Sequence, residues 1–297
     1  MRNVLITGGT GFLGRNVTKT LLDNNKNILI RTISRNENEL VETLVLCAND
    51  KRLDCIVGDI RSMKTIQYVL YGVDTVIHLA AMKHIDFCEE NPREAILTNI
   101  MATMNLLEVF SGDTFIGMST DKAVESTGCY GATKMLLEKV ILEKARKSKS
   151  GRYIVVRSGN IFNSTGSVIR KWIQQIKQNN KIVVTDIEMT RFFTPVEILA
   201  EFIAKTINDG KNGKIYIPKQ RSIKLGDLVD GIIKIYGNTN TEVIISGLRD
   251  GEKMHEMLFS KVEESEQYVV TELKINTSDK VDKLEPKVLE SWIKAIG

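Results

Sequence analysis

Five side chains that could move protons stand within fifteen residues of this chain: Thr120, Asp121, Lys122, Tyr130 and Lys134. On a helix, Tyr130 and Lys134 would share one face, one turn apart. A neighbouring ammonium favours a phenolate, which predicts a lowered pKa for Tyr130 and a role as a base near neutral pH. Asp121 and Lys122 add a carboxylate and a second ammonium. The alternative is an exposed loop followed by an amphipathic surface helix.

The elements around these residues are predicted to place them at a ligand site. Residues 114–118 are apolar and predict a short buried strand, and residues 131–147 predict a helix. In parallel α/β sheets, ligands bind where the carboxyl end of a strand leads into a helix. A nucleotide-binding loop at the start of the same chain favours this interpretation over the surface loop.

That loop is the segment Gly8-Gly-Thr-Gly11-Phe-Leu-Gly14, which follows a short apolar strand at 3–7 and begins a helix through residue 22. Glycines at these positions let the backbone turn tightly and approach a pyrophosphate, and the helix N-terminus supplies amide donors. The segment therefore predicts dinucleotide binding rather than a chance glycine-rich turn. The candidate contacts are Gly8, Thr10, Gly11, Phe12, Leu13 and Gly14.

The preferred dinucleotide is predicted from the end of the second strand, residues 27–33. A site for NAD usually carries an acid there to hold the ribose hydroxyls. Here Ser34 and Arg35 follow the strand, no acid stands in that place, and an arginine can pair with a 2′-phosphate. We therefore expect NADP, the alternative for Arg35 being an ordinary surface arginine. Further candidate cofactor contacts at the ends of the third and fourth strands are Asp59, Ile60, Ala80, Ala81 and Lys83.

The alternation of strands and helices predicts a doubly wound parallel sheet with a smaller interleaved α/β lobe. Residues 1–158 would form the dinucleotide-binding domain, with 190–217 returning to it, and 159–189 with 218–297 would bind substrate. Helices are expected at 63–71, 92–110, 168–177, 195–207, 225–236 and 252–259, and strands at 54–57, 75–79, 153–157, 182–185, 214–217 and 242–246.

Composition excludes several other classes of protein. The net charge of +4 comes without a dense Lys/Arg face, so no nucleic-acid partner is expected. The four cysteines show no Cys-x-x-Cys spacing, and we expect no metal site and a reduced, cytoplasmic protein. No apolar run approaches the length of a membrane span, so no membrane partner is expected. His78 lies within an apolar strand and is predicted to be a hydrogen-bonded core histidine.

Several segments together resemble a known family. They include His78-Leu-Ala-Ala81-Met-Lys83-His84, Ser119-Thr-Asp-Lys-Ala-Val124, Tyr130-Gly-Ala-Thr-Lys134, Arg157-Ser-Gly-Asn160 and Arg249-Asp-Gly-Glu-Lys-Met-His-Glu256. From residue 2 to about 260 the chain resembles the nucleotide-sugar branch of the extended short-chain dehydrogenases/reductases. Within that branch it is similar to UDP-N-acetylglucosamine 4,6-dehydratases, particularly those that invert C5. Thr-Asp-Lys is the specific signal, because the related hexose 4,6-dehydratases carry Thr-Asp-Glu there, and ordinary 4-epimerases lack this acid/base pair. The sequence departs from the family at Asp86, Arg170 and Asp250, where relatives usually have proline, and at 124–128.

The resemblance implies a redox-neutral reaction on UDP-N-acetylglucosamine. Tyr130 would remove the proton of the 4-hydroxyl while C4 gives hydride to NADP⁺, and Thr120 would hydrogen-bond the same oxygen. Lys122, its ammonium partly neutralised by burial and a cationic neighbour, would take the C5 proton. Asp121 would protonate the leaving 6-hydroxyl. Hydride would then return to C6, and a proton added to the opposite face of C5 would give an L-configured 4-keto-6-deoxy sugar.

The resemblance also implies substrate contacts and a homo-oligomer. Relatives pair through the helices that correspond to 92–110 and 130–147. A C5-retaining dehydratase is the nearest alternative, since many retaining relatives carry Met where Tyr130 stands. A catalytically silent NADP-binding scaffold is the other, although the catalytic set is complete. The implied substrate contacts are Lys83, His84, Asn160, Ser167, Val168, Arg191, Arg249 and Glu252.

Overall fold

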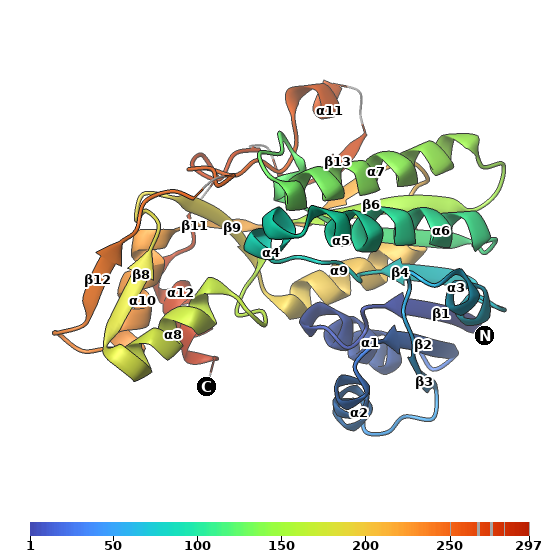
Figure 1. Cartoon of the computed structure of the whole chain (residues 1–297), viewed down its shortest axis with the longest axis horizontal. Helices are drawn as coiled ribbons and strands as arrows, with labels where there is room; N and C mark the ends of the chain where they lie inside the picture. Colours follow the sequence, from blue (N-terminus) through green and yellow to red (C-terminus); the bar gives the residue numbers. More distant parts are fainter. Residues whose placement is uncertain (250, 266–267, 274–275, 282, 297) are drawn as a thin grey trace.

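The computed structural model describes residues 1–249, 251–265, 268–273, 276–281 and 283–296. Within them the main sheet has the strand order β13-β10-β6-β5-β4-β1-β2-β3, and each neighbouring pair is parallel. This confirms the predicted doubly wound sheet (Figure 1). The strands are β1 (Arg2–Thr7), β2 (Ile28–Ser34), β3 (Leu53–Val57), β4 (Thr75–His78), β5 (Thr114–Thr120), β6 (Arg152–Ser158), β10 (Ile215–Ile217) and β13 (Val269–Thr271).

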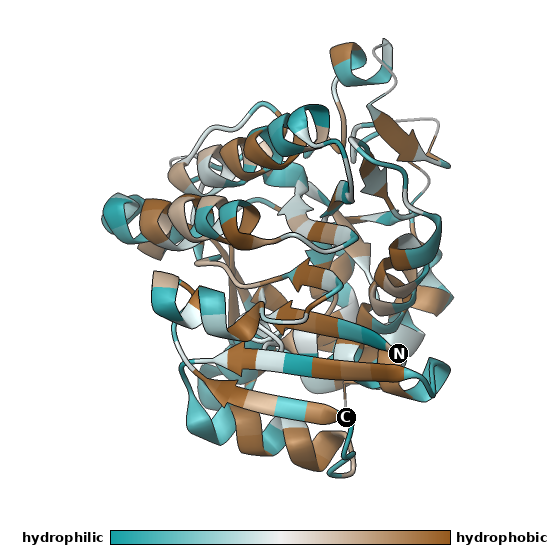
Figure 2. Cartoon of the chain, turned by 90° about the vertical axis from the view of Figure 1, so that its right-hand side faces the viewer, coloured by the Kyte–Doolittle hydropathy of each residue, from teal (hydrophilic) through white to brown (hydrophobic). Residues whose placement is uncertain are grey.

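Helices cover both faces of this sheet because its strands are apolar on both sides. One face packs against α3 (Met63–Val69), α6 (Ala102–Val109) and α7 (Cys129–Lys147). The other packs against α1 (Phe12–Asn24) and α9 (Val196–Asp209). Figure 2 shows the hydrophobic strands enclosed by helices whose outer sides are more hydrophilic.

A smaller lobe carries its own apolar core, centred on the buried Trp172. Its strands form a sheet in the order β11-β9-β7 and a pair, β12 with β8. Whether the chain divides at the predicted domain boundaries stays a prediction, but β13 lies at the edge of the main sheet. The elements of the lobe are β7 (Asn160–Ile161), α8 (Val168–Asn179), β8 (Lys181–Val184), β9 (Thr190–Thr194), β11 (Arg221–Lys224), α10 (Leu225–Tyr236), β12 (Glu242–Ile245) and α12 (Pro286–Lys294). The short helix α11 (Lys261–Ser265) lies instead beside the main sheet, where its Glu263 pairs with Arg157 of β6 (Figure 1).

The predicted helix at 252–259 is wrong. Its backbone groups bond to distant strands and loops instead of to each other. Thr190 N donates to Met254 O at 3.1 Å, and Ser278 N donates to Glu256 O at 2.9 Å. These non-local bonds hold the segment extended across the carboxyl end of the main sheet.

The predicted helix at 92–110 is interrupted. It consists of α5 (Pro92–Ile96), a π-helical turn η1 (Leu97–Met101) and α6. The sequence also gave no indication of α2 (Glu37–Leu46) or α4 (Ile85–Glu90), the two helices that follow β2 and β4. Among the described residues, no helix is both long and apolar enough to cross a membrane.

Candidate active site

The glycine-rich loop has the backbone geometry that a pyrophosphate site requires. Gly8 has φ +70°, a left-handed conformation that favours glycine, and a Cβ there would stand 2.7 Å from Ala80 N. A Cβ on Gly14 would stand 2.5 Å from Gly9 Cα, so only glycine lets α1 begin this close to the loop. Gly11 is the N-cap of α1 and no side chain caps it. The amides of the first turn, which begins with Phe12 and Leu13, are therefore available to an anion.

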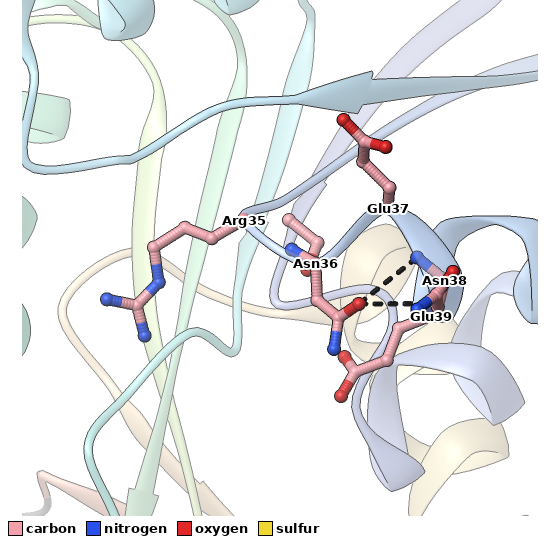
Figure 3. Close-up of a pocket in the computed structure, with 6 residues that line it drawn as sticks. Arg35, Asn36, Glu37, Asn38 and Glu39 are labelled. Carbon is pink, nitrogen blue, oxygen red and sulfur yellow. Dashed lines mark hydrogen bonds between the residues drawn. The ribbon is translucent and has the colours of Figure 1, made fainter.

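At the end of β2 the structure corrects the prediction that no acid is present. The turn after Ser34 and the start of α2 bring Glu39 back to the glycine loop. Thr10 Oγ1 donates to Glu39 Oε2 at 2.8 Å and lies 3.0 Å from Ser34 Oγ. Ser34 and Glu39 line a surface pocket with Arg35, whose side chain extends away from Glu39 (Figure 3). A carboxylate and a guanidinium thus both border the place predicted for the ribose.

The other predicted cofactor residues follow β3 and β4. Asp59 is bound by Arg61, at 2.6 Å between Oδ2 and Nη2, and the Arg61 hydrogen bonds lower the pKa of Asp59 against the effect of burial. Ile60 is buried in the core beside it. Ala80 and Ala81 follow β4, where Ala80 abuts Gly8.

Asn99 positions the loop after β4, and the sequence did not single it out. It is buried in the π turn η1, a kind of helical bulge found frequently at functional sites. Its side chain accepts from Met82 N at 2.8 Å, donates to Met82 O at 2.9 Å and donates to Thr133 of α7 at 3.0 Å. Asn99 thereby fixes the loop to the helix that carries Tyr130.

The acid–base residues meet at the carboxyl end of β5. Thr120 is the last residue of the strand, and Asp121 and Lys122 form a 3₁₀ turn, η2 (Asp121–Ala123). Thr120 Oγ1 donates to Asp121 Oδ1 at 2.8 Å, and Lys122 Nζ donates to the same oxygen at 3.0 Å. Asp121 is fully buried, and its Oδ2 atom has no hydrogen-bond partner.

Glu256 completes this cluster, although its role was not anticipated from the sequence. Its Oε1 atom lies 3.5 Å from Lys122 Nζ and 3.8 Å from Arg191 Nε, and its Oε2 atom is buried without a partner. Lys122 Nζ also donates to Asn160 Oδ1 at 3.4 Å. The structure therefore brings Asn160 and Arg191, both predicted to bind substrate, to this cluster.

The charges in the cluster differ from the expected ones. Burial raises the pKa of Asp121, with Lys122 opposing and Glu256 adding to the effect. Burial acts to lower the pKa of Lys122, but the carboxylates of Asp121 and Glu256 outweigh it, so this pKa is raised. The prediction of a partly neutralised Lys122 is thus wrong for the substrate-free protein, because two carboxylates stabilise its ammonium.

Tyr130 and Lys134 lie one turn apart near the start of α7, but they do not act on each other as predicted. Burial raises the pKa of Tyr130 to about 12, with Lys122 opposing. Burial lowers the pKa of Lys134 to about 8, and its Nζ donates to Met118 O at 2.7 Å. The expected lowering of the Tyr130 pKa by Lys134 is absent, because the ammonium is directed to the backbone of β5.

Tyr130, Lys122, Arg191, Glu252 and Glu256 line one pocket beside this cluster. The pocket is bordered by the segment that carries Glu252 and Glu256. Lys253 Nζ donates to Val124 O at 2.7 Å, and Thr127 Oγ1 donates to Gly251 O at 2.6 Å. The segment therefore closes over the turn that precedes α7.

The remaining predicted substrate residues border this region without joining the cluster. Lys83 Nζ donates to Thr165 O at 3.0 Å. The ring of His84 packs against Gly166, where a Cβ would stand 2.6 Å from Cε1. Arg249 pairs with Asp86 at 3.3 Å on the surface. The last two predicted residues lie at the N-terminus of α8, where Ser167 is the N-cap and Val168 the first residue.

His78 is confirmed as a hydrogen-bonded core histidine. Its Nδ1 atom lies 2.7 Å from Thr7 Oγ1 and its Nε2 atom 2.9 Å from Thr103 Oγ1, and burial lowers its pKa to about 3. The four cysteines are free thiols. Across the described part of the chain, His, Cys, Asp and Glu form no group of three or more that could hold a metal ion.

The chain matches a family model described as polysaccharide biosynthesis protein over residues 4–277. An uncharacterized membrane protein of Methanocaldococcus jannaschii is 36% identical, over 88% of this chain and 81% of that protein. A UDP-glucose 4-epimerase of Rickettsia massiliae is 35% identical, over 88% and 79%. A UDP-N-acetylglucosamine 4,6-dehydratase (inverting) of Campylobacter jejuni is 36% identical, over 87% and 78%.

Solved structures share the whole architecture. Pen from Bacillus thuringiensis has a TM-score of 0.91 and 30% identity, covering 99% of this chain and 97% of that one. DesIV, a dTDP-glucose 4,6-dehydratase from Streptomyces venezuelae solved with NAD bound, has a TM-score of 0.80 and 19% identity, covering 98% and 96%. At that identity, the likeness to DesIV shows the fold alone.

Proposed function

The chain belongs to the polysaccharide biosynthesis protein family of extended short-chain dehydrogenases/reductases, and on that premise we propose that it is a C5-inverting UDP-N-acetylglucosamine 4,6-dehydratase. The supporting observation is the joined set of Thr120, Asp121 and Lys122 beside Tyr130 at the carboxyl end of β5. Eliminating water across C5 and C6 needs an acid and a base besides the residue that acts at C4. This cluster supplies all three.

The glycine loop and the start of α1 fit a dinucleotide, because Gly8 and Gly14 let the loop pack directly against β4 and α1, and no side chain caps the amides of the first turn of α1. When bound, the nicotinamide would accept hydride from C4 and return it to C6, and its positive charge would favour the Tyr130 phenolate. Arg35 would pair with a 2′-phosphate and make NADP the preferred form. Glu39 is the competing determinant, since a carboxylate at this place accepts hydrogen bonds from the ribose hydroxyls of NAD.

Each chain residue has a defined proton to move. Tyr130 takes the proton of the 4-hydroxyl, and Thr120 holds the same oxygen. The resulting ketone acidifies C5, so Lys122 Nζ takes the C5 proton as the C5–H bond breaks. The C6–O bond breaks next, and the hydroxyl leaves as water with a proton from Asp121, whose raised pKa suits a proton donor. A proton then returns to the opposite face of C5.

Substrate and partner chain are part of the proposal. Asn160, Arg191, Arg249 and Glu252 would hold the UDP portion, since guanidinium groups match phosphate oxygens. Lys83 and His84 would also contact the substrate. The substrate-binding lobe would comprise residues 159–189 and 218–297. A homo-oligomer would form through the helices from α5 to α7.

A UDP-glucose 4-epimerase is the second candidate, because relatives named so are as similar as the dehydratase. Epimerisation at C4 breaks no bond at C5 or C6. An epimerase would therefore need neither the acid Asp121 nor the base Lys122. The hydrogen bond between these two residues is the observation that favours the dehydratase.

One incubation separates the two activities. The purified protein is mixed with UDP-N-acetylglucosamine carrying deuterium at C4, and the product is analysed by proton NMR. A 4-keto-6-deoxy sugar with the deuterium at C6 and an inverted C5 supports the proposal. A C4 epimer with an intact 6-hydroxyl assigns the protein to the epimerases, and a ketone with unchanged C5 configuration to the retaining dehydratases.

A further inference from the structure

Glu256 is fixed in place from both sides of its backbone. Its N–H donates to Ser278 Oγ at 2.8 Å, and its carbonyl accepts from Ser278 N at 2.9 Å. Ser278 is itself buried and lies 2.7 Å, Oγ to Oγ1, from Thr190. The carboxylate is only 3% exposed and therefore has little freedom to move away from the cluster.

The carboxylate stands between two cations. Lys122 Nζ lies 3.5 Å and Arg191 Nε 3.8 Å from Glu256 Oε1, while the other oxygen is buried without a partner. All three side chains line the pocket that also contains Tyr130. A buried carboxylate is costly unless paired, so this placement depends on the two cations.

The charged and titratable groups around Lys122 come from four elements. They are Asp121 from η2, Tyr130 from α7, Arg191 from β9, and Lys253 with Glu256 from the segment 251–260. Removing the charge of Glu256 would leave Lys122 facing the carboxyl group of Asp121 and the guanidinium of Arg191.

We propose that Glu256 is a positioning residue for the C5 step: it holds the Lys122 ammonium at the pocket wall and sets the pH at which Lys122 becomes a free amine able to take the C5 proton. This inference rests on the proposed function, since it concerns the same step. In that step the C5–H bond breaks, a bond to Lys122 Nζ forms, and the electron pair moves toward the C4 ketone. Lys122 must first give its ammonium proton to solvent, and Glu256 opposes that loss.

The test is the pH dependence of deuterium uptake at C5 of UDP-N-acetylglucosamine in heavy water. In Glu256→Gln, the rise of C5 exchange with pH should move to lower pH by about one unit or more, because an opposing charge at this distance has been removed. Glu256→Asp keeps the charge, so its rise should stay near that of the wild type even if the plateau falls. Glu89→Gln removes a carboxylate that lines the same pocket but pairs with Cys129 N rather than with Lys122, and its rise should not move.

A second readout needs no turnover. Lysine NMR of the substrate-free protein follows the titration of Lys122, whose signal is identified by its absence in Lys122→Ala. The midpoint should fall in Glu256→Gln and not in Glu89→Gln. If the wild type exchanges no C5 proton but this midpoint still falls, the proposed function fails, and what stands is that Glu256 holds Lys122 in its ammonium form. An unchanged midpoint and an unchanged pH profile in Glu256→Gln overturn the inference. If the glutamine variant does not fold, Glu256→Asp decides: a rise near that of the wild type supports the inference, and a shifted rise overturns it.

Discussion

Substitution of Glu138 by Gln should destabilise the protein strongly, because it breaks a buried ion network. Arg157, at the end of β6, is 1% exposed and donates to Glu138 of α7 at 2.8 and 2.6 Å. The same guanidinium donates to Leu258 O at 2.7 Å and to Glu263 of α11 at 2.7 Å. The network thus connects the main sheet, α7 and the end of the segment that carries Glu256.

The size of the effect follows from the burial of the pair. Removing one partner of a buried ion pair typically costs about 3–5 kcal/mol, because it leaves a charge without compensation. Glu263 still faces Arg157 in the variant, so we expect about 3 kcal/mol for Glu138→Gln. For Glu263→Gln we expect about 1.5–3 kcal/mol, the range for a hydrogen bond to a charged group. Glu263 has a lowered pKa, chiefly through Arg157 against burial, so its contribution is present above its unfolded-state pKa and is lost as pH falls.

Urea unfolding, followed by circular dichroism at neutral pH, measures these differences. Glu143→Gln is the matched control, since Glu143 lies on the same helix and pairs with Lys147 on the surface, and its midpoint should not move. A midpoint for Glu138→Gln equal to that of the control would refute the reasoning that Arg157 depends on this carboxylate.

Three further outcomes are expected. Arg35→Asp should weaken NADP(H) binding, measured by fluorescence titration, by about 1.5–3 kcal/mol, the value of a charge-assisted hydrogen bond. Purified protein that carries mainly NAD, with unchanged NADP affinity in the variant, would contradict this. Tyr130→Phe should bind UDP-N-acetylglucosamine without reducing the nicotinamide. Lys122→Ala should oxidise C4 and then stall, with an absorbance that corresponds to about one reduced nicotinamide per site. Equal behaviour of the two variants would argue against separate roles. The helices from α5 to α7 expose apolar side chains such as Met101 and Met104, which are 42% and 44% exposed. Light scattering at micromolar concentration should therefore give the mass of a dimer or a larger oligomer, and the mass of a monomer would exclude this interface.

The sequence by itself determined the features that depend on neighbouring residues. The glycine loop, the strand before it and the helix after it lie within one short segment, and their residue types alone specify a turn against a helix N-terminus. Tyr130 and Lys134 follow the same rule, because a four-residue spacing on a helix fixes their common face. The parallel sheet could likewise be predicted from apolar runs that alternate with helical periodicity.

The tertiary structure alone decided how the charges of the candidate site are distributed. Glu39 reaches Thr10 only because a turn and a helix reverse the chain after β2, and Glu256 reaches Lys122 from 134 residues further along. The segment around Glu256 was predicted to be a helix, and only the tertiary structure shows that its backbone bonds go to Thr190 and Ser278 instead. A pKa depends on burial and on charges that surround a group in space, so neither the ammonium of Lys122 nor the raised pKa of Tyr130 could be inferred from sequence spacing.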